Sequence, residues 1–97
     1  MQVKFETDYL YLLFADSFFQ DKQIGVKATG AYRLIVNYLL SVQRITDLHQ
    51  ASFLNLSPCN DSSGHYSITV NSKCNLIIHI ENEQIVLHRL ELKDHPK

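Results

Sequence analysis

The chain lacks the sequence features that mark membrane-embedded and secreted proteins. No apolar run among its 97 residues approaches the roughly 18 residues that a membrane-spanning helix requires. Residues 1–8 turn acidic by Glu6 and contain no basic stretch followed by an apolar run, so we expect no signal peptide. These absences lead us to expect a soluble cytoplasmic protein.

The sequence is also poor in motifs that carry common chemistry. Cys59 and Cys74 are the only two cysteines, and they form neither a CxxC metal pair nor the disulfide framework of a small secreted domain. The five histidines include no HxH or HxxxH pair and have no carboxylate or thiolate at ligand spacing, so we expect no metal and no cofactor. The Walker A, dinucleotide-binding, nucleophile-elbow and HExxH motifs are absent as well, which removes the usual support for nucleotide binding and common hydrolase schemes.

Charge is balanced along the chain. Nine lysines and arginines oppose ten acidic residues, the formal net charge is -1 and the sequence pI is near 6.5. Such a chain does not carry the overall basic charge typical of nucleic-acid binders, so any RNA contact requires a local patch. The length and the 45% hydrophobic content predict one domain over residues 1–97 with a single core.

Apolar spacing predicts an α+β fold in which two N-terminal helices precede a sheet. We expect a strand over residues 2–6, then a helix over about 8–19 capped by Thr7 or Asp8, and a second helix over about 28–43. A capped turn is predicted at 46–49 and an exposed loop at 57–63. The remainder reads as an antiparallel meander, with strands at 64–71, 74–80 and 85–95 joined by short hairpin turns.

Strand parity divides the meander into two faces, because successive side chains of a strand point to opposite sides. One face is predicted to be the core under the helices: Tyr66, Ile68, Val70, Leu76, Ile78, Ile80, Val86, Leu90 and Leu92. The other is predicted to be polar: His65, Ser67, Thr69, Asn75, Ile77, His79, Leu87, Arg89, Glu91, Lys93 and His95. His65, His79 and His95 share this second face, whereas His88 is assigned to the core.

The polar face has the residue types that RNA cleavage requires. Attack by a 2′-hydroxyl needs one group to accept a proton, another to return one, and cations for the developing charge on phosphorus. His95 and His79 are our candidates for proton transfer, and Lys73, Arg89 and Lys93 are candidates for phosphate contacts. The alternative is that all of them are ordinary solvated side chains on an exposed sheet.

The order of several short segments resembles the RelE/HigB superfamily, the toxins of bacterial type II toxin–antitoxin systems. These segments are Phe5 with Tyr9-Leu10, Asp21-Lys22, Asp47-Leu48, a predicted strand at Leu54-Asn55, Gly64 with Ser67-Ile68-Thr69-Val70-Asn71, Leu76-Ile77-Ile78, and Leu92-Lys93-Asp94-His95. The resemblance is closest to the HigB-like branch. It implies a RelE-like fold, with two helices packed on a twisted, mostly antiparallel sheet.

The same resemblance implies a ribosome-dependent mRNA endoribonuclease that is silenced by a cognate antitoxin protein. His95 matches the family's C-terminal proton-transfer histidine, and Asn55 falls where HigB-like proteins carry a histidine or an asparagine. Two arginines of the family are replaced by Thr69 and Asn75 in this chain. The loop that is basic in the family contains no basic residue here and has the sequence Asn60-Asp-Ser-Ser-Gly64. The alternative is therefore a catalytically degenerate RelE-fold protein that acts by binding an antitoxin or another protein.

Overall fold

The computed structural model of the protein describes residues 2–59 and 64–92. The helical elements are α1 (Asp8–Ala15), α2 (Gly25–Ser41), α3 (Ile45–Gln50) and the 3-10 helix η1 (Ser52–Leu54). The strands are β1 (Gln2–Phe5), β2 (Ser57–Pro58), β3 (His65–Asn71), β4 (Cys74–Glu81) and β5 (Gln84–Leu92). The α+β class expected from the sequence is confirmed.

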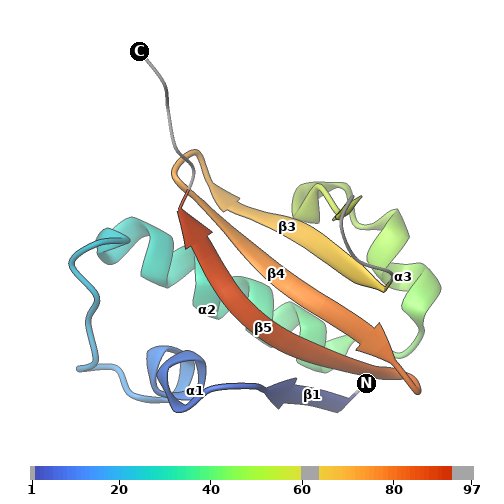
Figure 1. The fold of residues 1–97 in the computed structure, drawn as a ribbon, viewed down its shortest axis with the longest axis horizontal. Helices are drawn as coiled ribbons and strands as arrows, with labels where there is room; N and C mark the ends of the chain where they lie inside the picture. The colour runs from blue at the N-terminus through green and yellow to red at the C-terminus, as the bar shows by residue number, and fades with distance from the viewer. Residues whose placement is uncertain (1, 60–63, 93–97) are drawn as a thin grey trace.

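The strands form one five-stranded mixed sheet in the order β1-β5-β4-β3-β2. The run from β3 to β5 is antiparallel, as expected, and β2 adds a further antiparallel strand, whereas β1 lies parallel to β5 at the edge. A parallel neighbour cannot be reached through a tight turn, so the connection requires a crossover. Helices α1 and α2 are part of that crossover, and Figure 1 shows α2 behind β4 and β5.

The core fills the space between these helices and one face of the sheet. Tyr32 is fully buried there, and its hydroxyl donates a hydrogen bond of 2.7 Å to the Leu10 carbonyl, which ties α2 to α1. Burial raises the pKa of Tyr32 above its usual value, because the charged phenolate would be desolvated. The largest fully buried side chains on the strands are Ile68, Leu76, Ile78, Ile85 and Leu87.

Helix α1 begins as expected and ends four residues early. The Thr7 hydroxyl accepts a hydrogen bond from the Leu10 N–H at 3.3 Å, which makes Thr7 the N-cap. The helix ends at Ala15 rather than near residue 19. Arg33 of α2 explains this end, because its guanidinium donates hydrogen bonds of 3.0 Å to the carbonyls of Leu13 and Asp16.

The central part of the chain is more helical than expected. Helix α2 begins at Gly25, three residues before the predicted start, and residues 45–50 form the short helix α3 instead of a turn. The strand predicted at Leu54-Asn55 is wrong, since η1 ends at Leu54 and Asn55 adopts a left-handed conformation with φ of 51°. A two-residue strand, β2, lies instead within the predicted loop.

Both predicted hairpin turns are confirmed. The β4–β5 turn places Asn82 at φ 50° and Glu83 at φ 58°. Two consecutive left-handed residues match the twist of antiparallel strands better than an ordinary turn does. The β3–β4 turn lies at residues 72–73.

A β-bulge in β5 overturns part of the predicted division into faces. Ile78 pairs with Leu87 while Ile77 pairs with Arg89, so His88 is an extra residue in β5. The regular alternation of side chains between the two faces of β5 is interrupted at this residue. Leu87 belongs to the core rather than to the polar face, whereas Val86 is buried but lies outside the main core cluster.

Across residues 2–59 and 64–92, no helix combines the length and apolar character that crossing a bilayer demands.

Candidate functional site

The candidate site is the face of the sheet opposite α1 and α2, which we call the open face. In Figure 1 this face is turned toward the viewer, with α2 behind β4 and β5. Three histidines from three neighbouring strands gather on it: His65 of β3, His79 of β4 and His88 of β5. We call these three residues the histidine row.

His65 and His79 form a direct cross-strand pair. Their ring centroids lie 4.5 Å apart with 33° between the ring planes, and both side chains are partly buried. Gly64 allows this approach, since a Cβ at residue 64 would lie 3.1 Å from His79 Nε2, and the φ of +81° also favours glycine. His65 Nδ1 is buried and has no hydrogen-bond partner among the described residues.

His88 joins this pair because of the bulge. Its ring centroid lies 5.6 Å from that of His65, which contradicts its predicted place in the core. His88 Nδ1 lies 2.9 Å from Glu6 Oε1, and the two side chains are 30% and 46% exposed. The bulge makes both His88 and Arg89 oppose Ile77, and so turns His88 toward the open face.

Sequence reasoning missed His88 and Glu6. The sequence does contain a signal for the bulge. The apolar residues Ile85 and Leu87 have odd numbers, whereas Leu90 and Leu92 have even numbers, so the two pairs cannot share a face of a regular strand. Such a switch within one apolar strand indicates an inserted residue, and the polar pair His88-Arg89 lies where it occurs.

A second group on the open face consists of Asn55, Thr69 and Asn75, which we call the amide row. Asn55 Nδ2 donates a hydrogen bond of 3.2 Å to Thr69 Oγ1, and Thr69 pairs with Asn75 across β3 and β4. Asn75 Oδ1 is buried without a hydrogen-bond partner in the described part of the chain. The structure thus brings three of the predicted site residues together in a group that is separate from the His65–His79 pair.

Arg89 lies on the open face as predicted, but a carboxylate already pairs with it. Its guanidinium Nη2 lies 3.0 Å from Glu91 Oε2, and both side chains are 51% exposed. A phosphate would have to compete with Glu91 for this cation. The neighbouring Ile77 lies outside the main core and is nevertheless only 4% exposed; it pairs with Ser67 of β3 and with Arg89 of β5.

Lys73 does not join the histidine row. It lies in the β3–β4 turn, where it lines a hollow together with Lys27 and Gly25 of α2. His79 lies five residues beyond Cys74 along β4, which is about 17 Å at the usual rise of a strand. Lys93 and His95, the remaining candidates for phosphate contact and proton transfer, lie outside the described residues.

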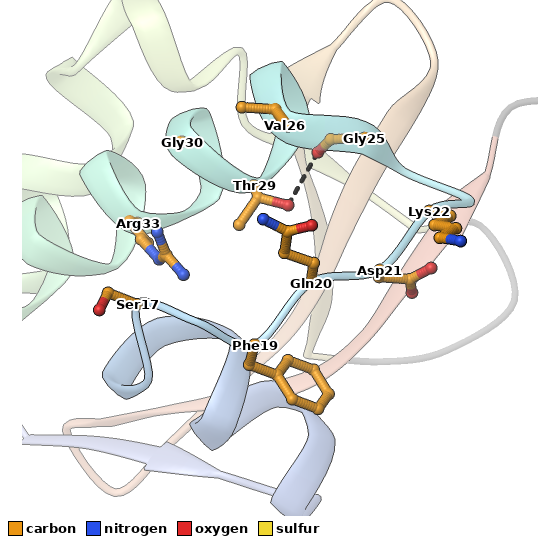
Figure 2. Close-up of a pocket in the computed structure, with 10 residues that line it drawn as sticks. All are labelled: Ser17, Phe19, Gln20, Asp21, Lys22, Gly25, Val26, Thr29, Gly30 and Arg33. Atoms are coloured by element: carbon orange, nitrogen blue, oxygen red, sulfur yellow. Dashed lines mark hydrogen bonds between the residues drawn. The ribbon is translucent and has the colours of Figure 1, made fainter.

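A cavity of about 420 Å³ lies elsewhere, between residues 17–22 and α2 (Figure 2). The polar groups that line this cavity form hydrogen bonds within the α1–α2 connection. Thr29 Oγ1 donates a hydrogen bond of 2.8 Å to the Gly25 carbonyl, and Arg33 donates its hydrogen bonds to carbonyls at the end of α1. Asp21 accepts hydrogen bonds from the Tyr9 hydroxyl and from the Gln23 N–H. We therefore assign this cavity to the packing of the α1–α2 connection rather than to the candidate site.

Metal binding is one chemistry that closely spaced histidines can support. Within residues 2–59 and 64–92, no three side chains among His, Cys, Asp and Glu are arranged so that they could hold a metal ion. Closely spaced imidazoles can also exchange protons with a bound ligand near neutral pH.

Comparison with known proteins gives no matching family model and no curated protein of similar sequence.

Proposed function

We propose that this protein is the toxin component of a type II toxin–antitoxin system and cleaves mRNA on the ribosome, in the cytoplasm. The observation that carries the proposal is the histidine row, in which the His65 ring lies 4.5 Å from that of His79 and 5.6 Å from that of His88. RNA cleavage by 2′-hydroxyl attack needs one proton acceptor and one proton donor, and imidazole serves both roles near neutral pH.

The arrangement of elements supports the proposed RelE-like fold. The chain runs from the edge strand β1 through α1 and α2, and then through the short elements α3, η1 and β2, into a three-strand meander. Two helices before a mostly antiparallel sheet are what the resemblance to RelE/HigB toxins implies. The open face carries His79, Asn55 and Arg89, three of the residues proposed for the site. A cognate antitoxin would then act by covering this face.

The second candidate is a catalytically degenerate relative that acts by binding an antitoxin or another protein. Two observations favour it. Arg89 is paired with Glu91, and Lys73 lies at the far end of β4 from His79. Phosphoryl transfer relies on cations that stabilise the transition-state charge, and the loss of one such group typically costs about 10²-fold or more in rate.

Growth on induced expression in a bacterial host separates the two candidates. We expect wild type to arrest growth and to produce cleaved mRNA ends, and we expect His79→Ala and His95→Ala each to relieve the arrest at matched protein levels. His49→Ala is the matched control, because His49 lies on α3 against Tyr66 rather than in the histidine row. Well-expressed, folded wild type that neither arrests growth nor cleaves mRNA would instead support the binding protein.

A further inference from the structure

Glu6 and His88 are held together by the backbone as well as by their side chains. Glu6 follows β1, and its N–H donates a hydrogen bond of 3.0 Å to the carbonyl of Leu87, the residue before His88. This bond sets the Glu6 carboxylate beside the bulge. The resulting contact, 2.9 Å between Glu6 Oε1 and His88 Nδ1, joins residues 82 positions apart in the sequence.

The chemistry of the two groups fixes where the imidazole proton lies. An ionised carboxylate can only accept hydrogen bonds, so His88 Nδ1 must carry the proton that it shares with Glu6. In the neutral ring the other nitrogen, Nε2, then has the lone pair. Glu6 therefore selects the Nδ1–H tautomer and orients the ring, which leaves Nε2 able to accept a proton.

We infer that His88 is the proton acceptor of the RNA cleavage proposed above and that Glu6 is its positioning residue; this inference rests on the proposed function. His88 Nε2 takes the proton of the 2′-hydroxyl as O2′ attacks phosphorus. The bond from phosphorus to O5′ then breaks, and a second imidazole, His79 or His65, gives its proton to O5′. The products are a 2′,3′-cyclic phosphate and a 5′-hydroxyl, with no other reactant required.

The surroundings of His88 fit this role better than those of its neighbours. Within the described residues, the structure gives a carboxylate partner to His88 but to neither His65 nor His79. The His88 side chain is 30% exposed, so a bound RNA can reach it. Its other neighbour is the His65 ring at 5.6 Å, so a proton donor lies close to the proton acceptor.

The inference is tested first without RNA, by ring-nitrogen NMR of isotope-labelled histidines in the full chain. At a pH where the imidazoles are neutral, we expect His88 to be the Nδ1–H tautomer in wild type. Glu6→Gln retains a carbonyl oxygen as acceptor and should preserve this tautomer, whereas Glu6→Ala should shift it toward Nε2–H. Glu91→Ala is the matched control, since it removes a carboxylate of the same face that pairs with Arg89. An Nε2–H tautomer for His88 in wild type would overturn the inference.

The second test measures single-turnover cleavage of mRNA on programmed ribosomes. We expect His88→Ala to lower the cleavage rate constant about 10²-fold or more. Glu6→Ala should lower it by a smaller factor without weakening RNA binding, and Glu6→Gln should restore part of the rate. If wild type cleaves RNA and Glu6→Ala cleaves at the same rate, the positioning role is wrong while the proposed function stands. If folded wild type cleaves no RNA, the proposed function fails, and the role of His88 fails with it.

Discussion

The two faces of one sheet differ in how their side chains are buried. On the covered face, Ile68, Leu76 and Ile78 are fully buried by helices that pack directly onto them. On the open face, which α1 and α2 do not cover, Ile77 is still only 4% exposed, and it pairs with Arg89 of β5. Side chains are therefore buried in two different ways in this fold. One face is closed by apolar packing against helices, whereas Ile77 is buried on a face that neither α1 nor α2 covers.

The largest effect is expected from a matched pair of substitutions on β4. Ile78→Ala removes a fully buried side chain from close-packed surroundings and should lower the free energy of unfolding by about 2–5 kcal/mol. Ile77→Ala removes the same atoms from the open face, where neighbouring side chains can relax into the space, and should cost at most about 2 kcal/mol. Urea unfolding measures both.

Equal losses for the two variants would contradict this distinction between the faces. If Ile78→Ala does not fold, Ile78→Val and Ile77→Val provide the same comparison with smaller changes, of about 0.5–1.5 kcal/mol.

A smaller effect is expected for a buried polar group in the helices that pack on the covered face. Tyr32→Phe removes the hydrogen bond to the Leu10 carbonyl and should lower the free energy of unfolding by about 1–2 kcal/mol near neutral pH. Tyr11→Phe is the control, because Tyr11 is 52% exposed on α1. A Tyr32→Phe variant as stable as wild type would mean that the Leu10 carbonyl finds another donor.

The same tyrosine makes stability depend on pH at the alkaline end. Because burial holds the folded pKa of Tyr32 above its usual value of 10.0, both states keep the proton below about pH 10. As pH rises from there toward the folded pKa, the unfolded chain alone loses the proton. The free energy of unfolding should then fall by up to about 1.4 kcal/mol per pH unit. In Tyr32→Phe the free energy of unfolding should decrease less steeply with pH. The decrease that remains comes from Tyr9, whose pKa is also raised.

The sequence predicted what depends on local spacing and missed what depends on distant partners. The hairpin turns at 72–73 and 82–83, a helix N-cap at one of Thr7 and Asp8, and the α+β class follow from neighbouring residues. The early end of α1 could not be predicted in this way. It depends on Arg33, which lies 20 residues from the Leu13 carbonyl that it reaches.

The same distinction applies to the candidate site. Parity placed His65, His79, Thr69 and Asn75 on one face, and the structure agrees, because β3 and β4 keep regular register through these pairs. Parity failed in β5, where one inserted residue moved His88 to the open face and Leu87 to the core. The partner of His88 was beyond sequence reasoning, since Glu6 meets it only through the parallel pairing of β1 with β5.

The smallest expected effect concerns the ion pair of Arg89 and Glu91, which tests whether the open face can bind phosphate. Glu91→Gln should change the free energy of unfolding by less than about 1 kcal/mol, because exposed ion pairs contribute little to stability. It should nevertheless strengthen RNA binding and steepen its dependence on salt, since Arg89 becomes available to a phosphate. Filter binding of a single-stranded RNA at several salt concentrations measures this, with Arg89→Ala as the opposite change. If Glu91→Gln leaves both affinity and salt dependence unaltered, Arg89 does not contact the RNA backbone. The binding protein would then explain the open face better than the nuclease does.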